Sequence, residues 1–250
     1  MTNSAPSTQQ ASAGTRPDAP ADWAAGLVIA VDGPAGSGKS SAARGVARQL
    51  GLRYLDTGAM YRALTWWLLD RHVDITDRLA VLARLREPEL EFGTDPGLPR
   101  VIADGQDVAG PIRTREVSNA VSAVAAIPEV RADLIAHQRQ LISGALEAGT
   151  GIVAEGRDIG SVVAPDAEVK VFLTASESIR ARRRSADLAA DPKATAEVTQ
   201  QEQARRDRRD APQMARAADA VEIDTTALDL DEVIAAIVGL ARSRRAARRD

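Results

Sequence analysis

The sequence contains no cysteine and only two histidines, and these absences remove several kinds of chemistry together. Disulfide scaffolds, thiolate metal sites and cysteine nucleophiles all require a residue that is missing. His72 and His137 lie far apart in the sequence, and no other soft ligand accompanies either of them. Zinc chemistry is therefore not expected.

Long apolar runs are missing as well. The longest, Val233 to Leu240, has eight residues, whereas a membrane-spanning helix needs about 20. Residues 1–21 are rich in Ser, Thr, Ala and Pro and lack the apolar middle of a signal peptide. We therefore expect a cytoplasmic protein without membrane contact. Residues 1–25 are predicted to be a disordered leader, because this composition buries too little surface to offset the entropy of ordering.

Lysine is scarce. Lys39, Lys170 and Lys193 are the three lysines among 32 cationic residues, so the other 29 are arginine. A GC-rich genome would explain this bias, yet arginine is also the side chain best suited to two-pronged recognition of phosphate. The formal net charge is −3 and aromatic residues make up 3% of the chain, so specific nucleic-acid binding is not expected.

The 250 residues do contain an alternation of short apolar runs and helical segments, which is typical of a doubly wound parallel sheet. Five apolar runs are short and continuous, as in strands that are covered on both faces. The predicted strands are 27–31, 53–55, 152–154, 169–173 and 221–223, and the predicted helices are 41–50, 59–71, 128–148, 176–189, 195–208 and 230–242.

One stretch interrupts this alternation. Leu90-Glu-Phe92 and Arg100-Val-Ile102 are short runs separated by a turn-rich segment, and Asp104-Gly105 follows them. Asp-Gly and Pro-Gly pairs between short alternating runs indicate β-hairpins. A small antiparallel insert outside the main sheet is therefore predicted.

The strongest functional signal is the segment Gly33-Pro-Ala-Gly-Ser-Gly-Lys39-Ser40. It matches G-x-x-x-x-G-K-[ST] and lies between a predicted strand and a predicted helix. Such a P-loop turns backbone N–H groups toward phosphate oxygens and adds the positive end of the helix. Lys39 is expected to bridge the β- and γ-phosphates of a nucleoside triphosphate, and Ser40 to hold Mg²⁺. The predicted ATP-binding residues are Gly33, Pro34, Ala35, Gly36, Ser37, Gly38, Lys39, Ser40 and Ser41.

Two further polar segments directly follow predicted strands, one at 55–62 and one at 154–158. Open parallel sheets bind ligands at the carboxyl ends of their strands, so Arg62 and Arg157 could converge on one anionic group. Downstream, Ala204-Arg-Arg-Asp-Arg-Arg-Asp210 concentrates charge. It is either a solvated helix end with ion pairs or a lid that closes cations over a transferring phosphoryl group.

With these residues in place, the chain resembles the bacterial cytidylate kinase family of P-loop nucleoside monophosphate kinases. The resemblance runs from about residue 27 to residue 240 and rests on the order and spacing of six motifs. They are Asp32-Gly-Pro-Ala-Gly-Ser-Gly-Lys-Ser40, Leu55-Asp-Thr-Gly-Ala-Met-Tyr-Arg62, Asp107-Val-Ala-Gly-Pro-Ile-Arg113, Val121-Ser-Ala-Val-Ala-Ala126, Glu155-Gly-Arg-Asp-Ile-Gly160 and Ile223-Asp-Thr-Thr226.

The resemblance implies an α/β fold: a five-stranded parallel P-loop sheet flanked by helices, an antiparallel insert that binds the nucleoside monophosphate, and a helical lid. The kinase domain would span 26–240, with the insert at about 57–150, the lid at about 188–216 and a basic tail at 241–250. The implied reaction transfers the γ-phosphoryl group of ATP to CMP or dCMP in pyrimidine nucleotide metabolism, giving ADP and CDP or dCDP. UMP would be a poorer acceptor, Mg²⁺ the cofactor, and the protein a monomer.

By position, the resemblance implies that Ser122, Arg131 and Asp158 read the cytosine base. A carboxylate at Asp158 would accept a hydrogen bond from the cytosine amino group and would face the uracil carbonyl unfavourably. Apart from the resemblance, helix capping and solvent exposure would explain the same three residues. The implied catalytic residues are Lys39, Arg157 and Arg206. The implied substrate-binding residues are Thr57, Arg62, Arg113, Ser122, Arg131, Arg157, Asp158, Arg206 and Asp210, among which Arg62 and Arg157, with Arg113 nearby, would bind the acceptor phosphate.

The lid departs from the family pattern. Arg206-Asp-Arg-Arg-Asp210 fits the usual Arg-Asp-x-x-Asp and would supply phosphate and ribose ligands. Ala211-Pro-Gln-Met214 then follows, and the segment is about four residues short. The arginine that the family places three residues after the second aspartate has no clear counterpart, and Arg209 and Arg216 are two candidate replacements.

Three other functions are compatible with a P-loop. An adenylate, shikimate or dephospho-coenzyme A kinase would lack the insert and the motif at 155–160. A GTPase switch would need Asn-Lys-x-Asp, but Asn3 and Asn119, the only asparagines, are followed by Ser and Ala. A nucleic-acid-binding ATPase would find support only for weak, nonspecific binding in the Arg-rich residues 241–250.

Overall fold

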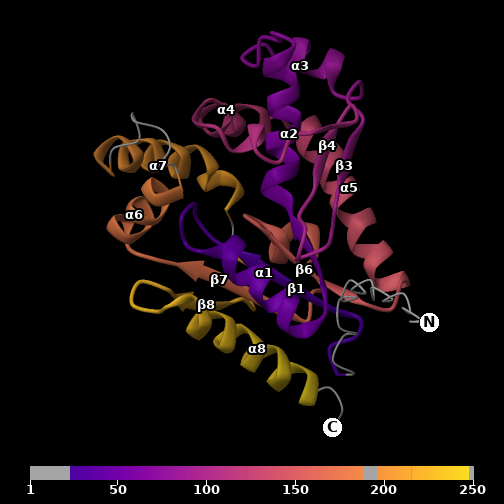
Figure 1. Cartoon of the computed structure of the whole chain (residues 1–250), viewed down its shortest axis with the longest axis vertical. Coiled ribbons are helices and arrows are strands. Elements are labelled where there is room, and N and C mark those ends of the chain that lie inside the picture. Colours follow the sequence, from indigo (N-terminus) through magenta and orange to yellow (C-terminus); the bar gives the residue numbers. More distant parts are fainter. Residues whose placement is uncertain (1–22, 188–195, 215, 248–250) are drawn as a thin grey trace, which may run out of the picture.

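The computed structural model describes residues 23–187, 196–214 and 216–247. Its centre is a five-stranded parallel sheet in the order β2-β6-β1-β7-β8 (Figure 1). The five predicted strands are confirmed, and each runs slightly beyond its predicted end. They are β1 (Leu27–Asp32), β2 (Arg53–Asp56), β6 (Gly151–Gly156), β7 (Val169–Thr174) and β8 (Val221–Asp224).

Helices account for most of the remaining described chain. Two of them, α3 and α4, were not predicted from the sequence. The helices are α1 (Lys39–Leu50), α2 (Thr57–Asp70), α3 (Arg78–Arg84), α4 (Arg115–Ala125), α5 (Pro128–Glu147), α6 (Glu177–Asp187), α7 (Ala196–Asp210) and α8 (Leu230–Ala246), with the single-turn segments η1 (Pro111–Arg113), η2 (Ile159–Val163) and η3 (Ala211–Gln213).

Helices cover both faces of the sheet. Successive side chains of β1 point to opposite faces, so alternate residues of this strand enter two different cores. Leu27, Ile29 and Val31 pack in one core with residues of α1 and α8. Val28 and Ala30 pack in a second core with residues of α2 and α5. All six residues of β1 are buried, which explains why the strand reads as a continuous apolar run.

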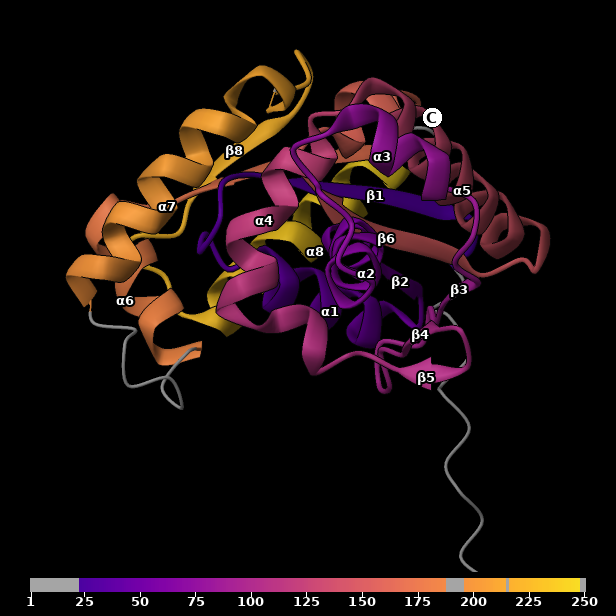
Figure 2. The ribbon, with the colours of Figure 1, turned by 90° about the horizontal axis from the view of Figure 1, so that it is seen from above.

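The predicted antiparallel insert is confirmed. It is a three-stranded sheet in the order β3-β4-β5, formed by β3 (Leu90–Phe92), β4 (Val101–Ala103) and β5 (Gln106–Asp107). Its apolar residues share a core with α2, α3 and α5. In Figure 2 the insert and α3 lie on one side of the molecule and α6 and α7 on the other, with α4 between them. The insert and the α6–α7 pair thus flank the carboxyl ends of the central strands.

The two ends of the folded chain differ from the predicted boundaries. Residues 1–22 of the predicted leader lie outside the described residues, but Ala24 is fully buried. The predicted boundary before residue 241 falls inside α8, where Ala241 is buried and Arg245 donates hydrogen bonds to the backbone oxygens of Trp23 and Ala25. Residues 241–246 therefore continue a packed helix. No helix in the described parts of the chain is both long and apolar enough to cross a bilayer.

Candidate active site

The segment between β1 and α1 forms a tight loop whose glycines are required by space. A side chain at Gly33 would place a Cβ 2.2 Å from the Leu173 carbonyl oxygen. Gly36, with φ +77°, would place one 2.8 Å from the Arg180 carbonyl oxygen. The helix α1 begins at Lys39, two residues earlier than predicted, so its N-terminus opens directly at the loop. A helix start of this kind attracts anions.

The loop lines a cavity of about 970 Å³. The cavity extends from the start of α1 to α4 and α5 in one direction, and to the start of α8 in the other. Of the predicted site residues, all but Gly33 and Pro34 line it. These lining residues are Ala35, Gly36, Ser37, Gly38, Lys39, Ser40, Ser41, Thr57, Arg62, Arg113, Ser122, Arg131, Arg157, Asp158, Arg206 and Asp210.

A carboxylate that the sequence analysis left without a role lies beside the P-loop. Glu155, at the end of β6, accepts hydrogen bonds from the Ser40 hydroxyl at 2.9 Å and from the Tyr54 hydroxyl at 2.6 Å. Burial, reinforced by the Asp56 carboxylate, raises the pKa of Glu155. Burial, reinforced by the Arg157 guanidinium, lowers the pKa of Lys39, whose ammonium donates to the Pro34 carbonyl at 2.8 Å. A buried acid and a buried base thus lie at the same loop.

A second buried carboxylate, Asp32, fixes the segment that follows β6. Its two oxygens accept hydrogen bonds from the backbone N–H groups of Ile159 and Gly160, both at 2.8 Å. Burial raises the pKa of Asp32 from 3.8 to about 6, against the opposing effect of these two donors. Because Asp32 directly precedes the P-loop, it ties the start of that loop to the segment that carries Arg157 and Asp158.

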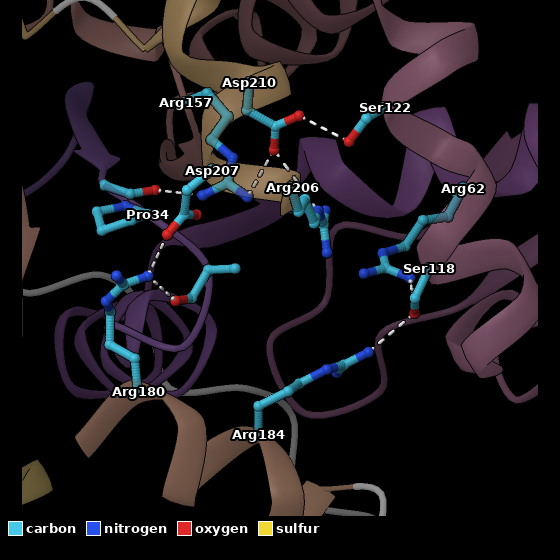
Figure 3. A network of polar contacts seen from close by, with 12 residues as sticks. Pro34, Arg62, Ser118, Ser122, Arg157, Arg180, Arg184, Arg206, Asp207 and Asp210 are labelled. Carbon is cyan, nitrogen blue, oxygen red and sulfur yellow. Dashed lines mark hydrogen bonds and ion pairs between the residues drawn. The ribbon is translucent and has the colours of Figure 1, made fainter. Parts of the chain in front are cut away.

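Three of the predicted substrate ligands meet across the cavity (Figure 3). Arg157 donates to the Gly33 carbonyl oxygen at 2.7 Å and to Asp210 at 3.0 Å. The Ser122 hydroxyl donates to the other oxygen of Asp210 at 2.7 Å. The P-loop, the segment after β6, α4 and α7 therefore converge on one polar cluster.

The remaining predicted base and phosphate ligands lie nearby. Arg131 and Asp158 form a mostly buried ion pair, so Arg131 is not the solvent-exposed side chain that the alternative reading assumed. Thr57 donates to the Glu155 carbonyl oxygen at 2.7 Å. Arg113 pairs with Asp56 at 3.1 Å, at the edge of the cavity, with about half of its side chain exposed.

Two arginines of the cavity have lowered pKa values. Arg62 is buried and donates to the Ser118 hydroxyl at 2.8 Å. Burial, together with the guanidiniums of Arg206 and Arg184, lowers the pKa of Arg62 well below its usual value. Burial, together with Arg157, lowers the pKa of Arg206 to about 10. The Nε atom of Arg206 lies 3.5 Å from Asp210 and makes no hydrogen bond to any described residue.

Neither candidate for the later lid arginine reaches this cavity. Arg209 is exposed on α7, and Arg216 is exposed and pairs with Glu222. The lid helix α7 is linked to the P-loop through Arg180 of α6. The Arg180 guanidinium donates to the Asp207 carboxylate of α7 and to the Ala35 carbonyl oxygen of the loop. The residues of the predicted lid at 188–195 and 215 lie outside the described residues.

The geometry also shows which residues could have been found from the sequence. Glu155 ends a strand that neighbours the P-loop strand, so its position was a usable signal. Asp32 belongs to the P-loop motif, but nothing local indicates that it binds the backbone 127 residues away. Arg184 also lines the cavity, but it belongs to a run of arginines on α6. Tertiary packing decides which of these arginines faces inward, so the sequence alone did not single out Arg184.

A family model and the curated relatives agree on one family. A family model described as cytidylate kinase matches residues 29–243. A curated cytidylate kinase of Streptomyces coelicolor is 51% identical over 234 residues, covering 93% of this chain and 98% of that protein. One from Streptomyces avermitilis is 50% identical over 223 residues, covering 89% of this chain and 95% of that protein. Among solved structures, a gluconokinase from Sinorhizobium meliloti 1021 aligns with a TM-score of 0.45 and 17% identity, covering 89% of this chain and 95% of that chain.

Proposed function

The chain belongs to the cytidylate kinase family and is a phosphotransferase that phosphorylates a nucleoside monophosphate; we propose that it transfers the γ-phosphoryl group of ATP to CMP or dCMP. The products are ADP and CDP or dCDP. One observation carries the proposal: a single cavity is lined by the P-loop and by Ser122, Arg131, Asp158 and Asp210. Donor and acceptor can therefore bind side by side, which phosphoryl transfer requires.

ATP binds with its triphosphate on the P-loop and the start of α1. The backbone N–H groups of the loop and the helix terminus neutralise the phosphate charge. The Lys39 ammonium leaves the Pro34 carbonyl oxygen, to which it donates in this structure, and bridges the β- and γ-phosphates. The negative charge of the triphosphate offsets the burial that lowers the pKa of Lys39, so ATP favours the charged amine.

CMP binds toward α4 and α5, where its base meets Ser122, Arg131 and Asp158. A carboxylate accepts from the exocyclic amino group, while Arg131 and Ser122 donate to the ring nitrogen and the carbonyl oxygen. Uracil carries a carbonyl in place of the amino group, which turns an attraction at Asp158 into a repulsion. The mostly buried Arg131–Asp158 ion pair holds the carboxylate in place, which supports preference for cytosine.

The phosphate of CMP is the nucleophile. It is anionic near neutral pH, so the reaction needs positioning and charge neutralisation more than a general base. Arg62, Arg157 and Arg206 supply positive charge where the acceptor phosphate and the transferring phosphoryl group meet, with Arg113 at the edge. Asp210 and Arg206 bind the ribose and phosphate when α7 closes over the cavity and excludes water.

Ser40 and Glu155 have the donor chemistry that Mg²⁺ prefers. Magnesium takes oxygen ligands, and it is usually held by one or two protein groups together with substrate phosphates and water. The Ser40 hydroxyl and the Glu155 carboxylate lie 2.9 Å apart at the P-loop. The described residues contain no group of three or more His, Cys, Asp or Glu side chains arranged for a metal ion. Bound there, Mg²⁺ would neutralise charge on the β- and γ-phosphates.

Several expectations from the sequence remain predictions. They are a monomeric state, a cytoplasmic location, the absence of a specific nucleic-acid partner, and the kinase domain with its insert at about 57–150 and lid at about 188–216. The site residues named above are likewise proposals about this chain.

The test measures ADP release from ATP and Mg²⁺ with CMP, dCMP, UMP, AMP and shikimate compared side by side. We expect the highest kcat/KM with CMP or dCMP, a lower value with UMP, and background rates with AMP and shikimate. A higher kcat/KM with UMP than with CMP would overturn the base assignment. Turnover of AMP or shikimate in place of CMP would overturn the proposed reaction.

A further inference from the structure

The shortened lid leaves one cation unaccounted for. The family pattern places an arginine three residues after Asp210, and this chain has Gln213 there. Gln213 lines the cavity but carries no charge. Arg209 and Arg216 are exposed and lie away from the cavity. Among the described residues, no arginine that follows Asp210 therefore lines the cavity.

Arg184 of α6 lines the cavity beside Arg62, which the resemblance implies is a ligand of the acceptor phosphate. Its guanidinium donates to the Ser118 hydroxyl at 2.8 Å, and the guanidinium of Arg62 donates to the same oxygen at 2.8 Å. A hydroxyl oxygen has two lone pairs, so it can accept both bonds. Figure 3 shows Arg62, Arg184 and Arg206 extending toward one another from three different helices.

This arrangement brings like charges together. The proximity of Arg184 contributes to the lowered pKa values of both Arg62 and Arg206, alongside their burial. Repulsion among neighbouring cations disfavours their charged forms; the carboxylate of Asp56 near Arg62, and those of Asp207 and Asp210 near Arg206, act against it, and a bound anion would add to their effect. A phosphate group placed beside Ser118 would relieve the repulsion and would offer two-pronged acceptors to each guanidinium.

We propose that Arg184 binds the phosphate of the acceptor nucleotide together with Arg62, and so supplies the positive charge that the shortened lid lacks. The inference rests on the proposed function, because it takes CMP as the acceptor. Arg184 moves from Ser118 onto the phosphate oxygens when CMP enters. Arg184 is thereby a substrate-binding residue on α6, a helix that precedes the predicted lid in the sequence.

The test compares the binding of CMP and of cytidine, which lacks the phosphate, to the full-length protein by titration calorimetry. The variants are Arg184→Gln, Arg184→Lys and, as a matched control, Arg182→Gln on the exposed side of the same helix. Charge-assisted hydrogen bonds contribute on the order of 1.5–3 kcal/mol, so Arg184→Gln should weaken CMP binding by roughly 10- to 100-fold. Cytidine binding should change by less than about twofold, on the same argument.

Arg184→Lys keeps the charge and loses the planar fork, so its loss in CMP affinity should be smaller than that of Arg184→Gln but measurable. Arg182→Gln should bind both ligands like the unaltered protein. An unchanged CMP affinity in Arg184→Gln would overturn the inference, and so would an equal loss for CMP and cytidine, which would indicate a structural effect. If Arg184→Gln fails to fold, the CMP-to-cytidine difference in Arg184→Lys decides the question.

The proposed function is tested independently by the unaltered protein. If that protein neither binds nor phosphorylates CMP, the proposed function fails. If it does both and the Arg184 variants bind CMP equally well, only the role of Arg184 fails.

Discussion

Ser122 and Asp210 lie 88 positions apart and are joined by a 2.7 Å hydrogen bond between α4 and α7. The resemblance implies a cytosine ligand in one and a ribose ligand in the other. In the structure they bind each other, with Arg157 on the second oxygen of the same carboxylate. Bound CMP would replace the Ser122–Asp210 contact with contacts of its own. If α7 closes over the site as proposed, it would return to this hydrogen-bonded position after the product leaves.

The preference for cytosine should depend on the charge of Asp158. Asp158→Asn would offer an amide N–H₂ to the uracil carbonyl and would lose the ion pair with Arg131. We expect the ratio of kcat/KM for CMP to that for UMP to fall by roughly 10- to 100-fold, as for the loss of a charge-assisted hydrogen bond. Steady-state kinetics with both acceptors measures the ratio. A ratio equal to that of the unaltered enzyme would show that Asp158 does not read the base.

The lid register can be tested with two neighbouring arginines. Arg206 is mostly buried beside Asp210 and lines the cavity, whereas Arg209 is exposed on the same helix. Arg206→Ala should lower kcat by about 10²-fold or more, since it removes preorganised charge near the transferring group. Arg209→Ala is the matched control and should stay within about twofold, as is usual for exposed positions. Equal rates for the two variants would mean that the lid register is wrong.

The proposed dependence of the rate on Mg²⁺ should respond to Glu155. Glu155→Gln keeps the shape of the side chain and can still accept from the Tyr54 hydroxyl, but it removes the negative charge beside Ser40. The Mg²⁺ concentration for half-maximal rate should rise by roughly tenfold, a common cost for an altered metal-site partner. Binding of metal-free ATP, measured by calorimetry, should not weaken. An unchanged Mg²⁺ dependence would remove Glu155 from the metal site.

The stability of the fold should carry a signature of Asp32 at mildly acidic pH. Burial raises the pKa of Asp32 from 3.8 to about 6, so between these values the folded protein binds more protons at this group than the unfolded chain does. The contribution of Asp32 to the free energy of unfolding therefore decreases as pH rises from about 4 to about 6.

Asp32→Asn isolates this contribution, because asparagine does not titrate. Urea denaturation of both proteins at several pH values gives the difference in unfolding free energy, taken as the unaltered protein minus the variant. The difference should become smaller as pH rises through the window from about 4 to about 6. A difference that grows with pH would mean that the pKa of Asp32 is lowered in the folded state.

The sequence predicted the elements whose signals are local. Each of the five parallel strands is a short apolar run because both faces of the sheet are covered, and the P-loop lies where its motif requires. The helices α3 and α4 escaped prediction, since α3 has only seven residues and α4 follows a turn at η1. Their N-caps, Asp77 and Thr114, were the signals available in the sequence.

The site was less predictable than the fold, because its contacts join distant segments. Arg184 is one of three consecutive arginines on α6, and only the packing of that helix against α7 decides which of them faces the cavity. The bond between the Asp32 carboxylate and the backbone after β6 exists because β1 and β6 pair in parallel. Neither relationship follows from residue type or spacing.

Arg245 fastens the two ends of the folded chain to each other. Its guanidinium binds the backbone oxygens of Trp23 and Ala25 and the carboxylate of Glu168, while Glu168 also accepts from the N–H of Val28 at the start of the sheet. A protease that trims the basic end up to residue 240 would therefore loosen the amino-terminal segment as well. Removal of Arg245 would also expose the segment around Trp23 and Ala25 to proteolysis, so both ends of the folded chain would become cleavable together.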